Sequence, residues 1–534
     1  MADSKPKLLI FCFLLISGIL SAQDRYMVFY KDKTGTPFSI AQPDQFLTQK
    51  SVQRRSRQGI AIVEQDLPVN PTYVSNVKST GARVMFSSRW FNASLVEATT
   101  AQRDSVRALP FVLLVELVAP GKTGTGRIRT FGSIEKAFAT EATQNQNSIL
   151  GLDEMHQDGL NGQGITIAIF DTGFPGVNTN PAFADIIQQG RIRDSYNFSY
   201  GLPNVFMGHE HGARVFSIIA AIIPANFTGG AFGADFLLYA TEYISTEYRV
   251  EEYNWAFAAE RADSAGADII SSSLGYNEFN DPTMNYTIAD LDGQTAVVTR
   301  AATFAFQRGI VVVNAAGNFG NDPWKFVAAP ADAINVMAVG SIDSKYNLSS
   351  FSSLGPTADG RTKPDVMALG TSASSVLPGG SIAAGDGTSY SCPQIASFVA
   401  NVWQNWPNLT AVEMLDLIRK SGSRYFNPDN MFGYGVPTYR AVKNILSSQA
   451  NREGVLVYPN PTGGELNIAM SPNDGSRVDI LLRNTSGQEL QRMNYQSIWH
   501  LNPITMDLTN LAPGVYTIHV SSNHSVKIFR IVKK

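Results

Sequence analysis

The sequence predicts an α/β protein with a doubly wound, mostly parallel sheet, preceded by a small α+β module and followed by an all-β module. Between about residues 148 and 447, apolar runs alternate with helix-like segments, which is typical of a parallel sheet covered on both faces. The segments on either side follow different patterns. The chain has 534 residues, more than one hydrophobic core usually serves, so about three domains are expected.

The first 22 residues have the pattern of a secretory signal peptide. Two lysines precede an apolar run from Leu8 to Leu20, and small residues follow it. We expect cleavage after Ala22, with a retained membrane anchor as the alternative. Cleavage would remove Cys12 and leave Cys392 alone, so the mature chain is expected to hold no internal disulfide and no transmembrane segment.

Residues 23–118 predict the small α+β module. Strands are expected at 26–30, 82–86, 93–98 and 111–118, and helices at 44–58 and 99–109. The first of these helices carries a basic run, which we interpret as a solvent-exposed face and not a binding patch: Lys50, Arg54, Arg55 and Arg57. Residues 119–147 are rich in Gly, Thr, Gln and Asn, which indicates an exposed linker.

Five apolar runs in residues 148–447 are the expected strands of the sheet: 165–170, 236–240, 267–273, 309–314 and 334–340. Helices are expected between them. Gly266 and Gly309 follow two of these helices. We expect each glycine to mark the end of its helix, since glycine commonly occupies the position after the last helical residue. Residues 454–534 consist of short strand patterns separated by turn residues, which predicts an all-β sandwich.

The charge of the chain excludes one class of partner. The formal net charge is −3, and only 16% of the residues are charged. A weakly acidic chain of this kind is not expected to bind nucleic acid.

Chemically active residues follow the expected strands or open the expected helices. Asp171 follows the strand at 165–170, and Asn318 follows the strand at 309–314, which are the places where functional groups collect in parallel sheets. His211 opens a helix with an apolar inner face. The stretch GTSYSCP opens another helix with three candidate nucleophiles: Ser389, Ser391 and Cys392.

These residues lie in motifs that resemble the subtilisin-like (subtilase) serine proteases. The motifs are AIFDTG, HGARVFSIIAA, SSSLG, VVNAAGN, FSSLGPTADGRTKPDVMALG and GTSYSCP, in that order over about 149–447. The resemblance implies that Ser389 is the nucleophile, His211 its general base and Asp171 the acid that orients the histidine. It also implies an oxyanion site made by Asn318 and the Ser389 backbone N–H. By the same resemblance, an extended substrate would pair with Ser273, Leu274 and Gly275.

Each assignment has a rival within the sequence. Asp171 could simply cap a turn, His209 could replace His211, and Asn314 could replace Asn318. Cys392 could be a reactive thiol, since a helix start lowers a thiol pKa. The acidic loop around Asp292 could bind Ca²⁺, although its spacing favours an ordinary surface loop and no metal ligands are assigned.

The chain departs from the family pattern near two catalytic residues. Ala213 stands where the family usually has Thr, and Tyr390, Cys392 and Gln394 lie in a stretch that often has other residues in the family. Neither departure removes a catalytic atom, so they bear on efficiency and specificity.

Both flanking modules carry further resemblances. Residues 23–118 resemble an inhibitor-type subtilase propeptide at SSRWFNASLVEAT and LPFVLLVEL, which implies processing within 119–147. The alternative is a permanently attached domain. Residues 454–534 resemble a type IX secretion sorting domain at VYPNPTGGELNI and LAPGVYTIHV. The alternative there is a sandwich for adhesion or carbohydrate binding.

Together these features predict a secreted serine endopeptidase made as a zymogen, with protein or peptide substrates and its own propeptide as inhibitor. The C-terminal module would engage the export machinery of a Gram-negative bacterium and take the protein through the periplasm to the cell surface or medium. No cofactor is required by this prediction, and a structural Ca²⁺ is the one addition that it allows. The alternatives are a catalytically inactive binding protein of the same fold and an enzyme that transfers acyl groups to amines.

Overall fold

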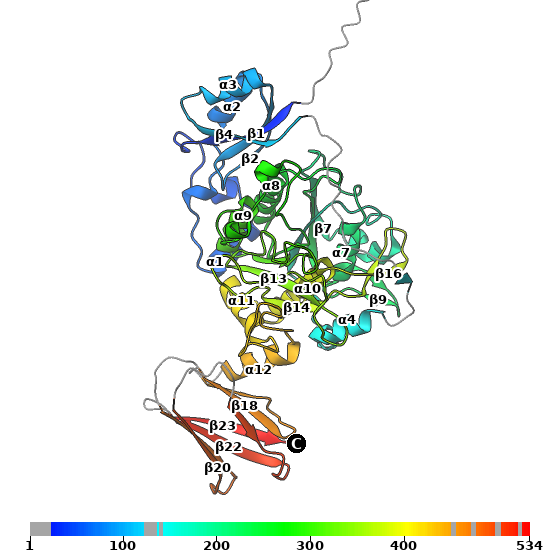
Figure 1. Cartoon of the computed structure of the whole chain (residues 1–534), viewed down its shortest axis with the longest axis vertical. Helices are drawn as coiled ribbons and strands as arrows, with labels where there is room; N and C mark the ends of the chain where they lie inside the picture. Colours follow the sequence, from blue (N-terminus) through cyan, green and yellow to red (C-terminus); the bar gives the residue numbers. More distant parts are fainter. Residues whose placement is uncertain are drawn as a thin grey trace, which may run out of the picture.

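The computed structural model describes residues 23–121, 136–137, 142–449, 455–470, 477–496, 504–521 and 526–534. Figure 1 shows the N-terminal module, the large α/β module and the C-terminal β module one after another along the long axis. The predicted signal peptide and much of the predicted linker lie outside the described residues. None of the helices within the described residues is long and apolar enough to cross a membrane.

A four-stranded antiparallel sheet forms the N-terminal module. Its strands run in the order β2 (Arg83–Ser88), β3 (Ala93–Ala98), β1 (Asp24–Tyr30) and β4 (Val112–Ala119). Helices α2 (Pro71–Ser79) and α3 (Thr100–Arg107) share a core with the sheet. The four strands and α3 were predicted. Helix α2 was missed because its sequence PTYVSNVKS has little apolar periodicity and buries only Val77.

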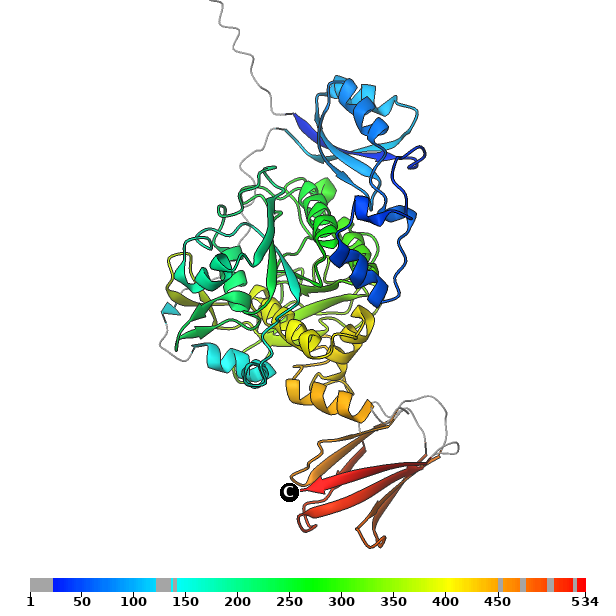
Figure 2. The same cartoon turned by 180° about the vertical axis from the view of Figure 1, so that it is seen from behind.

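The segment between β1 and α2 holds helix α1 (Gln49–Arg57) and the 3₁₀ turns η1 (Pro43–Gln45) and η2 (Glu64–Asp66). Helix α1 starts at Thr48, whose side chain accepts a hydrogen bond from the Ser51 backbone N–H. The interpretation of its basic run as a solvent-exposed face is wrong for Arg54 and Arg55, whereas the side chains of Lys50 and Arg57 are each 40% exposed. Arg54 and Arg55 are 2% and 1% exposed, because α1 lies against the α/β module (Figure 2).

Seven parallel strands form the central sheet. Their order is β14 (Val366–Leu369), β13 (Val336–Ile342), β12 (Val311–Ala315), β11 (Ile269–Ser272), β6 (Thr166–Asp171), β10 (Asp235–Ala240) and β7 (Ile192–Asn197). The five inner strands are those predicted. The two edge strands were missed because β14 has four residues and β7 is largely polar.

Helices cover both faces of this sheet, as predicted. Helices α7 (His211–Ala220) and α10 (Thr388–Asn405) pack on one face, and α8 (Val250–Ala265) and α9 (Val297–Gln307) pack on the other. Alternate residues of β6 enter the two cores, with Ile167 and Ile169 on the α10 side and Ala168 and Phe170 on the α8 side. The N-terminal sheet packs on the outside of α8 and α9, and shares their core.

Smaller elements complete the α/β module. The helices are α4 (Ala142–Leu150), α5 (Leu152–Gln157), α6 (Ala184–Gln188), α11 (Ala411–Lys420) and α12 (Tyr439–Gln449). The 3₁₀ turns are η3 (Pro181–Phe183), η4 (Pro282–Met284) and η5 (Ile288–Asp290). The short strands are β5 (Lys136–Ala137), β8 (Ile222–Ile223), β9 (Phe227–Thr228), β15 (Ala373–Val376) and β16 (Ile382–Gly385).

Two antiparallel sheets enclose one core in the C-terminal module, as its strand pattern predicted. The first sheet contains β17 (Val455–Tyr458), β18 (Glu465–Met470) and β21 (Ile504–Asp507). The second contains β20 (Glu489–Gln496), β19 (Arg477–Arg483), β22 (Gly514–Ser521) and β23 (Val526–Lys533).

Candidate active site

The candidate catalytic residues lie at element ends around one edge of the central sheet. Asp171 is the last residue of β6, and His211 is the first residue of α7. Asn318 lies in the loop after β12, and Ser389 is the second residue of α10. Asp171, His211 and Ser389 are 0%, 3% and 8% exposed, so a low-dielectric environment surrounds them.

A short contact joins the candidate acid and base. His211 Nδ1 lies 2.8 and 3.0 Å from the two carboxylate oxygens of Asp171. A carboxylate only accepts hydrogen bonds, so Nδ1 carries the proton and Nε2 is left with the lone pair of a base. The backbone N–H and hydroxyl of Thr172 also donate to Asp171, at 2.7 and 3.0 Å.

The glycine after His211 makes this contact sterically possible. A Cβ atom at Gly212 would lie 2.2 Å from the carbonyl oxygen of Gly173 and 2.9 Å from Cβ of Asp171. Any larger residue would push α7 away from the end of β6. The motif HG therefore reflects the close approach of a helix and a strand end.

Ser389 sits against the segment predicted to bind substrate. Its hydroxyl donates to the Ser273 carbonyl oxygen at 3.4 Å, and the Ser273 hydroxyl donates to the Ser389 carbonyl oxygen at 2.9 Å. The Leu274 side chain is buried in the α8 core. At a helix start, the backbone N–H groups have no intrahelical acceptor, which suits them to bind developing negative charge.

The amide of Asn318 is oriented by the residue before Ser389. Its Oδ1 accepts hydrogen bonds from the backbone N–H and the hydroxyl of Thr388, at 2.8 and 2.9 Å. The Nδ2 group is therefore the end that can donate to a ligand. The rival Asn314 is buried within β12, and its Nδ2 donates to the carbonyls of Leu274 and Ala315. The Asn314 amide group is therefore used in hydrogen bonds inside the protein.

His209 and Asp292 also have structural roles. The His209 ring nitrogen Nδ1 accepts from the His211 backbone N–H at 3.2 Å, and burial lowers the His209 pKa. Asp292 accepts hydrogen bonds from the backbone of Gln294 and from Thr295 within its own turn. This arrangement agrees with a surface loop.

The departures from the family pattern lie directly beside the histidine. The Tyr390 ring centroid lies 6.3 Å from that of His211, and the Arg214 guanidinium lies 5.2 Å from the Tyr390 ring. Burial raises the pKa of Tyr390 to about 12, so its phenol stays neutral. Ala213 is packed into the α10-side core. The sequence identified Ala213 and Tyr390 as departures from the family pattern but did not predict these contacts.

Cys392 is expected to resist alkylation in the folded protein. Its thiol is fully buried, and burial raises the thiol pKa to about 12. Iodoacetamide should leave Cys392 unmodified and activity unchanged at pH 8, whereas denatured protein should be labelled fully. Mass spectrometry of tryptic peptides measures both states. Rapid labelling of native protein, with loss of activity, would restore the reactive-thiol hypothesis.

Three buried carboxylates offer the donor set for a metal ion. Glu242, Glu247 and Glu251 each place one oxygen within 4.8 Å of the others. Carboxylate oxygens are the ligands that Ca²⁺ prefers. The hydroxyls of Tyr276 and Thr241 donate to Glu242 at 2.5 and 2.8 Å, which already satisfies part of its charge.

Comparisons with known proteins cover all three modules. The model of the subtilase family matches residues 162–435. The peptidase S8 propeptide domain of Bacteroidota matches residues 25–128, and the secretion system C-terminal sorting domain matches residues 456–534. All three resemblances predicted from sequence are confirmed. The sorting domain indicates type IX secretion and a location outside the cell or on its surface.

Individual relatives are similar over the α/β module. Subtilisin BL of Lederbergia lenta is 29% identical over 282 residues, which are 53% of this chain and 91% of that protein. A subtilisin of Bacillus pumilus is 30% identical over 292 residues, covering 54% and 94%. The crystal structure of MycP1 from Mycobacterium smegmatis has 22% identity and a TM-score of 0.47, covering 61% of this chain and 92% of MycP1.

The family model covers more than half of the chain, and the relatives over this region are serine endopeptidases of the subtilisin type. The protein is accordingly a serine endopeptidase with a family propeptide in front of it. With this fold, propeptide and set of relatives, the chain belongs to the subtilase family.

Proposed function

We propose that the protein is a secreted zymogen that hydrolyses peptide bonds through Ser389, His211 and Asp171. The contact of 2.8 Å between His211 Nδ1 and Asp171 carries this proposal. It fixes a histidine tautomer whose other nitrogen is a base. A protein that only binds its partner has no need for such a buried pair, which argues against the inactive alternative.

The reaction would proceed by acyl transfer, with a serine ester as the intermediate. His211 Nε2 takes the hydroxyl proton as Ser389 attacks the scissile carbonyl, and the resulting oxyanion accepts hydrogen bonds from the Asn318 amide and the Ser389 backbone N–H. The same nitrogen returns the proton to the leaving amine. A water molecule, deprotonated by His211, then hydrolyses the ester and frees the serine.

An extended peptide segment is the proposed substrate. Ser273, Leu274 and Gly275 would pair with its backbone as a neighbouring strand, because main-chain hydrogen bonds bind peptides without regard to most side chains. The hydrogen bonds between Ser273 and Ser389 support this position beside the nucleophile.

Activation would require cleavage within residues 119–147. Until then residues 23–118 would inhibit the enzyme, and the packing of their sheet on α8 and α9 supports a docked propeptide. No organic cofactor is required for the proposed reaction, and the carboxylates of Glu242, Glu247 and Glu251 would be the ligands if a structural Ca²⁺ binds.

A fluorophosphonate probe tests the proposal. It phosphonylates only an activated serine, so processed protein should carry one adduct, on Ser389, located by peptide mass spectrometry. A His211→Ala variant should lose the adduct, and a His209→Ala variant should keep it. Folded, processed protein that takes up no probe would favour the inactive binding protein.

A further inference from the structure

A buried arginine lies on the same helix as the proposed base. Arg214 follows His211 by one turn of α7 and is 2% exposed. Side chains at this spacing lie on the same side of a helix, and both approach the ring of Tyr390 on α10. The His211 ring lies 6.3 Å from it between centroids, and the Arg214 guanidinium lies 5.2 Å from its centroid. The ring therefore contacts the base on one side and a cation on the other.

The polar partners of the guanidinium do not account for its burial. Its ion pair with Glu210 is 3.5 Å long, and the Glu210 side chain is 38% exposed. Its Nε donates to the Ser375 hydroxyl at 3.1 Å, and its Nη2 donates to the Ala384 carbonyl at 3.4 Å. Taking a guanidinium out of water is costly, and long contacts offset that cost only in part. The burial of a cation here therefore indicates a role other than stability.

The hydrogen bonds of Arg214 join α7 to the hairpin that precedes the nucleophile. Ser375 lies in β15 and Ala384 lies in β16, and these two strands pair antiparallel. The Ser375 hydroxyl also donates to the Ala383 carbonyl, at 3.4 Å. Arg214 therefore holds both strands of the hairpin from which the chain continues to Ser389.

The end of β16 leaves no room for a side chain. A Cβ atom at Gly385 would lie 2.7 Å from Cε2 of Tyr390 and 2.8 Å from Nη2 of Arg214, which is closer than non-bonded atoms approach. The backbone of β16 thus rests directly on the ring and the guanidinium. Tyr390 is 1% exposed and also packs against Ile218 and Ala373. A shift of the ring or of the guanidinium would therefore move the end of β16.

The turn after β16 carries the groups of the proposed reaction. Thr388 orients the Asn318 amide through hydrogen bonds of 2.8 and 2.9 Å, and Ser389 follows it in the chain. The Gly387 carbonyl accepts from the Tyr390 backbone N–H at 3.1 Å. Because these contacts join the turn to the start of α10, a displacement at the end of β16 would reach both the serine and the amide.

We propose that Arg214 is a positioning residue of the catalytic centre, which uses the ring of Tyr390 to hold the Ser389 turn in place beside His211. The proposal rests on the mechanism proposed above and adds one group to it. Arg214 touches neither the substrate nor the reacting atoms, and acts through the position of the serine and of the oxyanion donors. An error of about 1 Å in such a position costs about 10²-fold in rate.

The test compares processed, purified variants by two rates. Initial rates with a chromogenic peptide give kcat and KM, and the rate of fluorophosphonate labelling reports attack by Ser389 without a bound peptide. Arg214→Met keeps the apolar stem of the side chain and removes the cation. It should lower both kcat and the labelling rate about a hundredfold and leave KM within a few-fold of the parent. Thermal unfolding measures the stability of each variant separately, so a purely structural role would change the unfolding temperature and leave both rates at the parental values.

Substitutions of Tyr390 test whether the ring transmits the effect. Tyr390→Leu removes the ring and should cause a loss of similar size. Since both residues act through one contact, the double variant should be no slower than either single variant, to within a few-fold. Tyr390→Phe keeps the ring and should recover most of the loss seen with leucine. The comparison of Tyr390→Leu with Tyr390→Phe decides the proposal if Arg214→Met does not fold.

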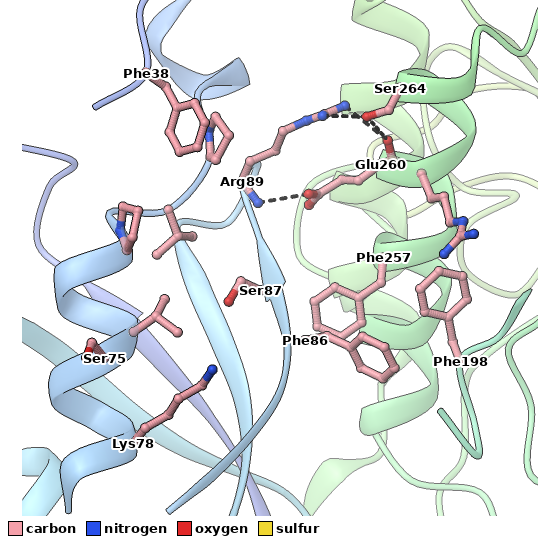
Figure 3. Close-up of a pocket in the computed structure, with 15 residues that line it drawn as sticks. Phe38, Ser75, Lys78, Phe86, Ser87, Arg89, Phe198, Phe257, Glu260 and Ser264 are labelled. Carbon is pink, nitrogen blue, oxygen red and sulfur yellow. Dashed lines mark hydrogen bonds between the residues drawn. The ribbon is translucent and has the colours of Figure 1, made fainter. Parts of the chain in front are cut away.

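Arg261→Met is the matched control, because Arg261 also lies over a tyrosine ring, at 4.7 Å from the centroid of Tyr196. It belongs to α8, on the other face of the sheet, and lines the cleft between α2 and α8 that Figure 3 shows. This variant should keep the parental kcat and labelling rate.

Two results would overturn the positioning role alone: labelling of Arg214→Met at the parental rate, or losses that multiply in the double variant. A folded, processed parent with no adduct on Ser389 would overturn the proposed function, and this role with it.

Discussion

The Ser389→Ala variant should lower kcat about 10⁶-fold, which corresponds to about 8 kcal/mol of transition-state stabilisation. A loss of this size is established for the catalytic serine of subtilisin. The variant lacks the oxygen that we propose as the nucleophile, and the neighbouring hydroxyl of Thr388 is bound to Asn318, so it is not free to replace it. Initial rates with a chromogenic peptide, measured on processed enzyme, give the value.

Ser391→Ala is the matched control for this substitution. Ser391 lies two residues further along α10, and its hydroxyl donates to the Ala368 carbonyl at 3.1 Å inside the core. Its loss should affect stability by about 1 kcal/mol and leave kcat within a few-fold of the parent. If Ser391→Ala abolished activity while Ser389→Ala retained it, the nucleophile would have been assigned wrongly.

The Asp171→Asn variant should lower kcat about 10⁴-fold with little change in KM. Asp171 accepts from His211 Nδ1 at 2.8 Å, and an asparagine can present an N–H group to that nitrogen instead. The histidine would then place its proton on Nε2, and the proposed base would be lost. The pH dependence of kcat should change along with its magnitude, since the carboxylate also stabilises the imidazolium.

Asp332→Asn provides the control for a buried carboxyl away from the site. Burial raises the pKa of Asp332, and its oxygens accept from Thr299 and from the Gly293 backbone N–H. The asparagine has nearly the same shape, so kcat should stay within a few-fold of the parent. An Asp171→Asn enzyme as active as this control would mean that the His211 contact is structural only.

Much of the fold follows from short-range patterns. The five inner strands are apolar because both faces of the sheet are covered, and Gly266 ends α8 with a φ of +89°, as its place after the helix predicted. The edge strands β7 and β14 lack this signal. Each has only one neighbour in the sheet, and a short or polar strand can be held by that pairing alone.

The sequence by itself determined the three modules, the five inner strands of the central sheet and the motifs that carry the chemistry. It did not exclude rival residues of the same type, such as Asn314 for Asn318. Both are asparagines near the end of the same strand, so residue type and position do not show which side chain is free to bind a ligand. Tertiary structure separated them: the Asn314 donors bind carbonyls inside the sheet, whereas Thr388 orients Asn318 from a helix some 70 residues later.

The basic run of α1 is the clearest case in which the sequence did not predict the surroundings of a side chain. A helix rich in arginine is usually solvated, and nothing local to residues 49–57 predicts otherwise. Its partner Asp263 lies more than 200 residues further along the chain, and only the docking of the propeptide on α8 brings the two together. Local periodicity determines which segments are helices, but the partner of a buried charge depends on long-range contacts.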